Sequence, residues 1–187
     1  MNSDIIKASV ASYFRYKIHC PLVCFERALH DYSRSGNPDV LCVTKDRRLI
    51  ETEVKVSLSD LKNDIKKRKW QFVELDKKHD WTNVYSPYKF YYAVPEGLLD
   101  KAKEVILDWR HEDKVCGNAG TLRISDNINA YKTHEVMVDL ACVINKKAPR
   151  LSIKAVIKMV QNQTGTLCSL ANKLAKINNI NVDDFSI

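Results

Sequence analysis

The sequence predicts an α/β protein with a mixed β-sheet flanked by helices, and three observations lead to this class. Short runs rich in β-branched residues alternate with segments whose apolar residues recur at helical spacing. The length of 187 residues and the hydrophobic content of 45% are sufficient for one real core. The order helix, three strands, helix, strand, helix, strand is typical of an α/β sandwich. We expect one domain, with a core over about residues 1–126 and a basic helical extension over about 149–178.

The first elements are a helix and three strands. Apolar residues in segment 4–16 recur at helical spacing, and Ser3 is the expected cap. Turn-forming residues then separate three short apolar runs at 22–29, 40–44 and 49–56. We interpret these runs as consecutive strands that are antiparallel neighbours.

The next elements alternate between helix and strand. Ser57 opens a capping box, and the apolar spacing after it predicts a helix from residue 58 to the mid-70s. The aromatic run at 89–94 predicts a strand, and the spacing at 98–109 predicts another helix. Residues 120–124 form a further candidate strand.

The last quarter of the chain is apolar and basic. Two apolar stripes, one on each side of Gly165, predict two helices. No Asp or Glu occurs between Leu140 and Val182, whereas several Lys and Arg residues do. This one-sign segment contributes to the formal net charge of +7, which favours a polyanionic partner.

Cysteine usage and hydropathy indicate the compartment. The six cysteines are scattered and none has CxxC spacing, which favours free thiols over a disulfide framework or a metal cluster. The N-terminus lacks the pattern of a signal peptide, and charges interrupt every long apolar stretch. We therefore expect a cytoplasmic protein that has no membrane partner.

One pair of predicted strands carries charged residues in a chemically suggestive pattern. Because residues two apart on a strand face the same side, Glu53 and Lys55 are expected to project together. Asp39 begins the preceding strand, and a hairpin would bring it beside Glu53. A Glu-x-Lys motif alone is commonly a structural ion pair, but its combination with Pro-Asp is unfavourable for strands that merely fill a core.

These residue types suit hydrolysis of a phosphodiester. The carboxylates of Asp39 and Glu53 can hold Mg²⁺ or Mn²⁺, with the backbone carbonyl of Val54 as a further ligand. Lys55 can orient or deprotonate the attacking water, and Glu26 could reach the same metal. An exchange of roles between Glu51 and Glu53 stays open.

Several motifs together resemble a known superfamily. The segments PDVLCV, ETEVKVS, SDLKNDIKKRKW and KFYYAVPEGL are similar to the PD-(D/E)xK nucleases, and most similar to the MmcB-like DNA-repair proteins. The resemblance covers roughly residues 20–126, with Val56 placed between Lys55 and Ser57 and with extra residues within 74–86 as departures. It implies a restriction-endonuclease-like core and a Mg²⁺-dependent endodeoxyribonuclease that acts in DNA repair, recombination or phage and mobile-element DNA processing.

The same resemblance suggests which side chains surround the substrate. It carries Asp60 and Asp64 over as supporting or substrate-facing residues, although Asp60 is equally a capping carboxylate. The structural alternatives are that Trp70 packs in the core and that Lys66 to Lys69 form a solvated basic face. The expected substrate-binding residues are Lys62, Lys66, Arg68, Lys69 and Trp70.

Two functional alternatives to a DNA nuclease stay open. The metal chemistry does not distinguish sugars, so RNA is a possible substrate beside DNA. A catalytically weak nucleic-acid-binding protein of the same fold is the other alternative. A homodimer is plausible because cutting a duplex usually needs two sites.

Overall fold

The computed structural model describes residues 1–25, 37–67, 70, 87–130 and 132–177. Its contacts group into two compact units, Met1–Leu151 and Ser152–Ile187. The first unit contains the sheet and the candidate site.

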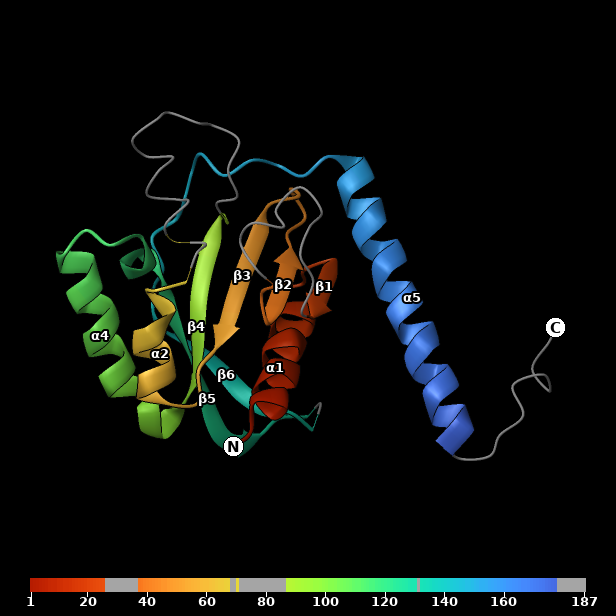
Figure 1. Cartoon of the computed structure of the whole chain (residues 1–187), viewed down its shortest axis with the longest axis horizontal. Helices are drawn as coiled ribbons and strands as arrows, with labels where there is room; N and C mark the ends of the chain where they lie inside the picture. Colours follow the sequence, from red (N-terminus) through yellow and green to blue (C-terminus); the bar gives the residue numbers. More distant parts are fainter. Residues whose placement is uncertain (26–36, 68–69, 71–86, 131, 178–187) are drawn as a thin grey trace. The chain divides into compact units, whose positions relative to one another are not determined.

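Six strands of the described chain form one mixed sheet in the order of the sequence (Figure 1). The first three strands pair antiparallel, the next two pairings are parallel, and the last is antiparallel. The predicted mixed sheet and its antiparallel first three strands are confirmed. The strands are β1 Leu22–Phe25, β2 Val40–Val43, β3 Leu49–Val54, β4 Lys89–Pro95, β5 Gly120–Ile128 and β6 His134–Leu140.

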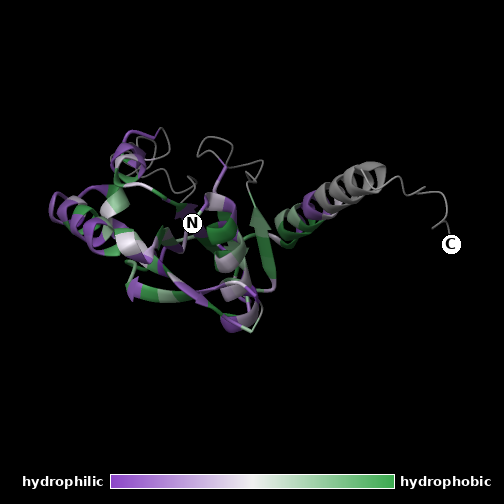
Figure 2. Cartoon of the chain, turned by 90° about the horizontal axis from the view of Figure 1, so that it is seen from below, coloured by the Kyte–Doolittle hydropathy of each residue, from purple (hydrophilic) through white to green (hydrophobic). Residues whose placement is uncertain are grey.

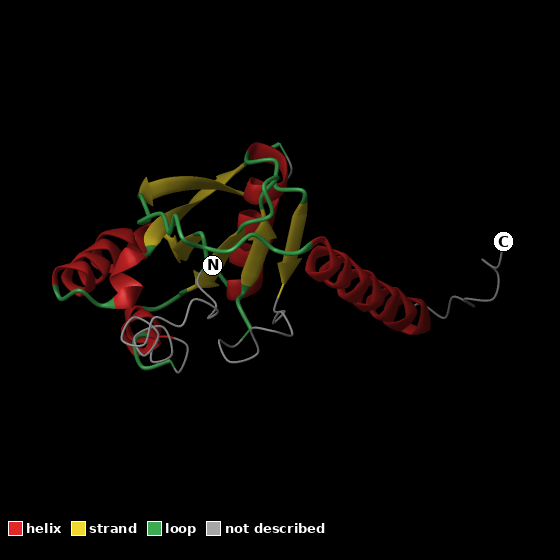
Figure 3. Cartoon of the chain, turned by 90° about the horizontal axis from the view of Figure 1, so that it is seen from above, coloured by secondary structure: helices red, strands yellow, loops and turns green. Residues whose placement is uncertain are grey.

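Helices cover both faces of this sheet (Figures 1 and 3). Residues of β4 alternate between the two faces, so that Tyr91 and Ala93 join one apolar cluster while Phe90 and Tyr92 join the other. The first cluster includes α1, and the second includes α2 and α4. The helices are α1 Ser3–Ser12, α2 Leu58–Asp64 and α4 Leu99–His111, with 3-10 turns at Glu96–Leu98 and Val115–Asn118.

The opening helix differs in detail from its prediction. Asn2, not Ser3, caps α1, because its side-chain oxygen accepts a hydrogen bond from the backbone N–H of Ile5 at 2.9 Å. The regular helix ends at Ser12, and a π-helical turn follows over Tyr13–Lys17. The apolar residues Ile6, Val10 and Phe14 nevertheless lie together against the sheet, as their spacing predicts.

The central position of β3 determines the burial of the candidate site. This strand pairs with β2 on one side and with β4 on the other, and all six of its residues are buried. Ile50 and Val54 belong to the α1 cluster. Glu53 pairs in register with Tyr92, which lies in the α2 and α4 cluster. Its carboxylate is thus held inside the protein rather than on a sheet edge.

The sequence did not predict β6, the edge strand that completes the sheet. Most of its side chains are partly or fully exposed, and Val136 is its one buried residue. The backbone at the end of β6 passes close to Gly120, where an added Cβ would lie 2.5 Å from the carbonyl oxygen of Leu140. A larger residue would therefore require the backbone to shift there.

The second unit contains one helix, α5, over Ile153–Ile177. The prediction of two helices divided at Gly165 is wrong, because a glycine inside a long helix costs only about 1 kcal/mol and does not break it. Figure 2 shows apolar residues in its first turns, and Ile153, Ile157 and Val160 are exposed. Within the described residues, no helix is both long enough and apolar enough to span a bilayer.

Candidate active site

Glu53 and Lys55 lie on one face at the end of β3, as their spacing predicts. The Lys55 ammonium is 3.9 Å from Oε2 of Glu53. The residues are only 5% and 3% exposed, respectively. Two oppositely charged groups are therefore held together with little access to water, where their interaction is stronger than on the surface.

Asp39 lies beside this strand, where the hairpin is expected to bring it. Val40, the next residue, pairs with Thr52 of β3. One carboxylate oxygen of Asp39, Oδ2, accepts a hydrogen bond from the backbone N–H of Val54 at 2.7 Å, and the other lies 3.5 Å from the Lys7 ammonium. The contact with Val54 thus uses its N–H, and metal ligation by its carbonyl stays a prediction.

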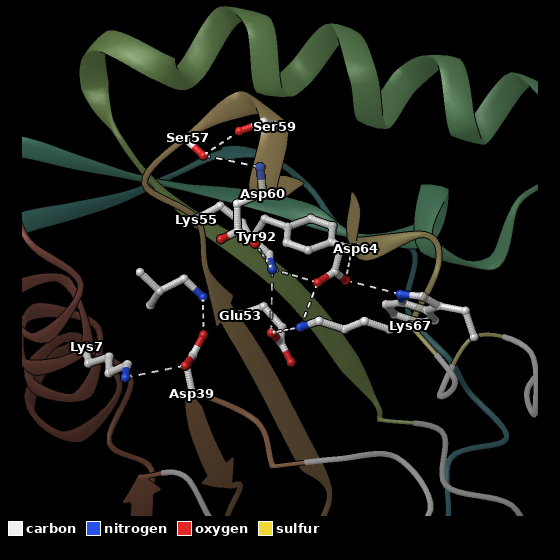
Figure 4. A network of polar contacts seen from close by, with 12 residues as sticks. Lys7, Asp39, Glu53, Lys55, Ser57, Ser59, Asp60, Asp64, Lys67 and Tyr92 are labelled. Carbon is white, nitrogen blue, oxygen red and sulfur yellow. Dashed lines mark hydrogen bonds and ion pairs between the residues drawn. The ribbon is translucent and has the colours of Figure 1, made fainter. Parts of the chain in front are cut away.

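A buried carboxylate at the end of α2 connects the site to its surroundings. Asp64 is 1% exposed, and its Oδ1 lies 2.6 Å from the Lys55 ammonium and 2.7 Å from the Lys67 ammonium. Its Oδ2 accepts hydrogen bonds from the Tyr92 hydroxyl at 2.8 Å and from the Trp70 indole at 3.1 Å. Four donors compensate the cost of burying this charge. Figure 4 shows these contacts.

Lys67 is the component of the site that the sequence did not single out. Its ammonium lies 2.7 Å from Oε2 of Glu53 and 2.7 Å from Oδ1 of Asp64 (Figure 4). Burial alone would lower the pKa of Lys67, but the negative charges of Glu53 and Asp64 raise it above its ordinary value. One signal in the sequence could have pointed to Lys67. It follows Asp64 by three residues, and side chains at this spacing lie close together on a helix.

The start of α2 is positioned by its cap. Ser57 caps the helix, because its hydroxyl accepts a hydrogen bond from the backbone N–H of Asp60 at 3.2 Å. The predicted cap is confirmed, and it leaves the Asp60 carboxylate 3.5 Å from the Lys55 ammonium. The helix is shorter than predicted, since it ends at Asp64 and a turn follows over 65–67.

The expected substrate-binding residues divide into three groups. Lys62 and Lys66 are exposed, and the Lys66 ammonium donates to Asn63 at 3.1 Å. Trp70 is buried, and its ring packs edge-on against Phe90 with ring centroids 5.0 Å apart, so its location is that of a core residue rather than a base-stacking surface. Arg68 and Lys69 lie outside the described residues, as does Glu26, the further residue expected to reach the metal.

Two carboxylates near the end of β3 are the candidate ligands for Mg²⁺. Asp39 and Glu53 offer the carboxylate oxygens that Mg²⁺ prefers, and this ion retains several waters, so that it needs few protein ligands. Among the described residues, the contacts in Figure 4 join four carboxylates and three ammonium groups. In the part of the chain that the structure describes, no group of three or more His, Cys, Asp or Glu side chains is arranged for a metal. Asp39 and Glu53 have the donor chemistry that Mg²⁺ accepts, and binding of the ion by these two carboxylates stays a prediction.

Fold and site together define an α/β protein with a buried carboxylate and lysine cluster beside its central strand. No family model matches the chain, and no curated protein matches it. Among solved structures, the chain is similar to SPO1766, a protein of unknown function from Silicibacter pomeroyi, with 12% identity and a TM-score of 0.50. The similarity covers 97% of this chain and 94% of that one. At this identity it shows a shared fold alone.

Proposed function

We propose that this protein is a Mg²⁺-dependent nuclease that hydrolyses phosphodiester bonds in DNA. The observation that carries the proposal is the burial of Glu53 and Lys55 on one face of β3, with Asp39 fixed against the backbone of that strand. Two carboxylates and a lysine in this arrangement are the groups that metal-assisted phosphodiester hydrolysis requires.

The energetic cost of this cluster supports a chemical role. Charged residues are rarely buried, and a buried ion pair often stabilises a fold no better than apolar residues of similar volume. Glu53, Lys55 and Asp64 nevertheless occupy buried positions around the end of a central strand. Groups retained at such cost are candidates for function.

In the proposed reaction, Asp39 and Glu53 hold the metal, and the carbonyl of Val54 is an additional ligand. When bound, the metal neutralises charge on the phosphate and makes its water a better nucleophile. Lys55 donates a hydrogen bond to the attacking water or to a phosphate oxygen. Its orientation toward this position depends on Asp64 and Asp60, whose carboxylates lie 2.6 and 3.5 Å from its ammonium.

Charge and motif resemblance support DNA as the substrate. The net charge of +7 favours a polyanion, and the exposed Lys62 and Lys66 on and just after α2 can contact phosphates. The proposed role in DNA repair, recombination or mobile-element processing rests on the resemblance to MmcB-like proteins.

The proposal is tested by a cleavage assay with labelled substrates. Single-stranded, duplex, flap and junction DNA, each with an RNA of matched sequence, are incubated with Mg²⁺, Mn²⁺ or EDTA. We expect cleavage of DNA that depends on the metal and is lost in Glu53→Gln but retained in Glu104→Gln, an exposed control on α4. Absence of cleavage of every substrate by the unmodified protein would refute the proposal, and preferential cleavage of RNA would replace DNA as its substrate.

A further inference from the structure

Two lysines contact the same carboxylate oxygen, and they differ in their freedom to move. Lys55 is 3% exposed and lies 2.6 Å from Asp64, so it is enclosed by the fold. The Lys67 side chain is 42% exposed and extends from the turn after α2, although its ammonium is also 2.7 Å from Oε2 of Glu53. Lys67 is therefore the lysine that can leave Glu53 without opening the core.

The contact of Lys67 occupies an oxygen that a metal would need. A divalent cation bound at Oε2 of Glu53 would compete with the ammonium that lies 2.7 Å from this oxygen, because two positive charges so close together repel each other. The flexible stem of a lysine allows its ammonium to be displaced at low cost. Asp64, whose Oδ1 is 2.7 Å from the same ammonium, provides an anchor that keeps Lys67 near the site after displacement.

We propose that Lys67 is a second catalytic lysine of this site, one that neutralises Glu53 before metal binds and contacts the substrate phosphate after the metal displaces it. This inference rests on the proposed nuclease function and assigns a residue and an order of events to it. Metal binding would thereby free the Lys67 ammonium from Glu53, so that it can contact the phosphate of the bound substrate.

The test compares Lys67→Ala with Lys101→Ala. Each change removes one positive charge, and Lys101 is an exposed residue of α4 to which no role in the site is assigned. Affinity for Mn²⁺ is measured by titration calorimetry without nucleic acid. Affinity for duplex DNA is then measured in Ca²⁺, and single-turnover cleavage in Mg²⁺. Lys67→Arg serves as a second variant that retains the charge.

We expect Lys67→Ala to bind Mn²⁺ about tenfold more tightly because the competing ammonium is gone, a coupling of ordinary size. The same variant is expected to bind DNA more weakly in Ca²⁺ and to cut more slowly in Mg²⁺. Lys101→Ala is expected to stay within about threefold of the unmodified protein in each measurement, as for a surface charge. Lys67→Arg should restore DNA binding.

Two results would overturn this inference, and they are distinguishable. If the unmodified protein binds Mn²⁺ and cuts DNA while Lys67→Ala matches Lys101→Ala, then Lys67 has no such role and the nuclease proposal stands. If the unmodified protein neither binds Mn²⁺ nor cuts, then the nuclease proposal fails together with this inference. Should Lys67→Ala unfold, Lys67→Gln takes its place, because it removes the same charge. Tighter Mn²⁺ binding with slower cutting then supports the inference, whereas unchanged Mn²⁺ affinity and unchanged cutting overturn it.

Discussion

The ammonium of Lys55, the residue directly after β3, lies 2.6 Å from Oδ1 of Asp64 at the end of α2. The other oxygen of this carboxylate accepts a hydrogen bond from Tyr92 on β4 at 2.8 Å. The candidate catalytic lysine is thereby connected to a helix and to the neighbouring strand. Asp64 orients Lys55, and it also contributes to stability.

The first prediction concerns the stability that Asp64 provides. Asp64→Ala should lower the free energy of unfolding by about 3–5 kcal/mol, because it leaves the buried ammonium of Lys55 without its nearest carboxylate. Urea unfolding followed by circular dichroism measures the change. Asp108→Ala, at an exposed position on α4, is the control. A loss no larger than that of the control would contradict the structural role of Asp64.

The second prediction concerns Tyr92. Tyr92→Phe keeps the buried ring but removes the hydroxyl that donates to Asp64 at 2.8 Å. The free energy of unfolding should fall by about 1.5–3 kcal/mol, which is the range for a hydrogen bond to a charged group. Urea unfolding again provides the measurement. A variant as stable as the unmodified protein would mean that this hydrogen bond contributes nothing.

The third prediction concerns the two proposed metal ligands. Asp39→Asn and Glu53→Gln should each abolish cleavage, because an amide is a weaker ligand for Mg²⁺ than a carboxylate. Gathered carboxylates alone would repel one another, and their removal would then stabilise the protein. The structure changes this expectation for Glu53, whose contacts with Lys55 and Lys67 make Glu53→Gln destabilising. Thermal unfolding without metal measures the difference, and a higher melting temperature for Glu53→Gln would contradict it.

The fourth prediction concerns the exposed lysines of α5. Lys154 and Lys158 both face solvent and lie one turn apart. If they contact phosphates, changing both to Gln should weaken binding to all DNA sequences and lower the salt slope by about one unit for each lost contact. The rate of cleavage at saturation should not change. Fluorescence anisotropy over a range of salt concentrations measures the slope.

The control for this experiment is a pair in the other unit. Lys101→Gln with Lys114→Gln removes the same charge from exposed positions of Met1–Leu151. Equal slopes for the two double variants and the unmodified protein would show that Lys154 and Lys158 make no phosphate contact.

The sequence was sufficient for the parts of the fold that depend on local periodicity. The alternation in the strand predicted that Glu53 and Lys55 share a face, and the expected hairpin predicted that Asp39 lies beside this strand. β6 escaped prediction because only Val136 is buried, so its pattern lacks regular alternation. Gly165 misled the prediction of α5, because local propensity does not decide whether a long helix continues.

The candidate site was predicted less completely because two of its members depend on contacts between elements. Asp64 was considered only through the motif resemblance, and its contacts with Lys55 and Tyr92 follow from the packing of α2 on β3 and β4. Lys67 could not be separated from the basic residues around it until the turn after Asp64 placed its ammonium on Glu53. No spacing rule along one strand contains this information.

The most direct test of the central claim is the single-turnover rate of DNA cleavage in Mg²⁺ and in Ca²⁺, for the unmodified protein and for Lys55→Ala. The account predicts rapid cleavage by the unmodified protein in Mg²⁺ and little in Ca²⁺, whose longer and looser coordination aligns the attacking water poorly. It further predicts that Lys55→Ala binds DNA with nearly unchanged affinity but cleaves it at least about a hundredfold more slowly, the smallest effect typical of a positioned proton-transfer group. Equal rates in the two metals, or an unchanged rate for Lys55→Ala, would contradict the account.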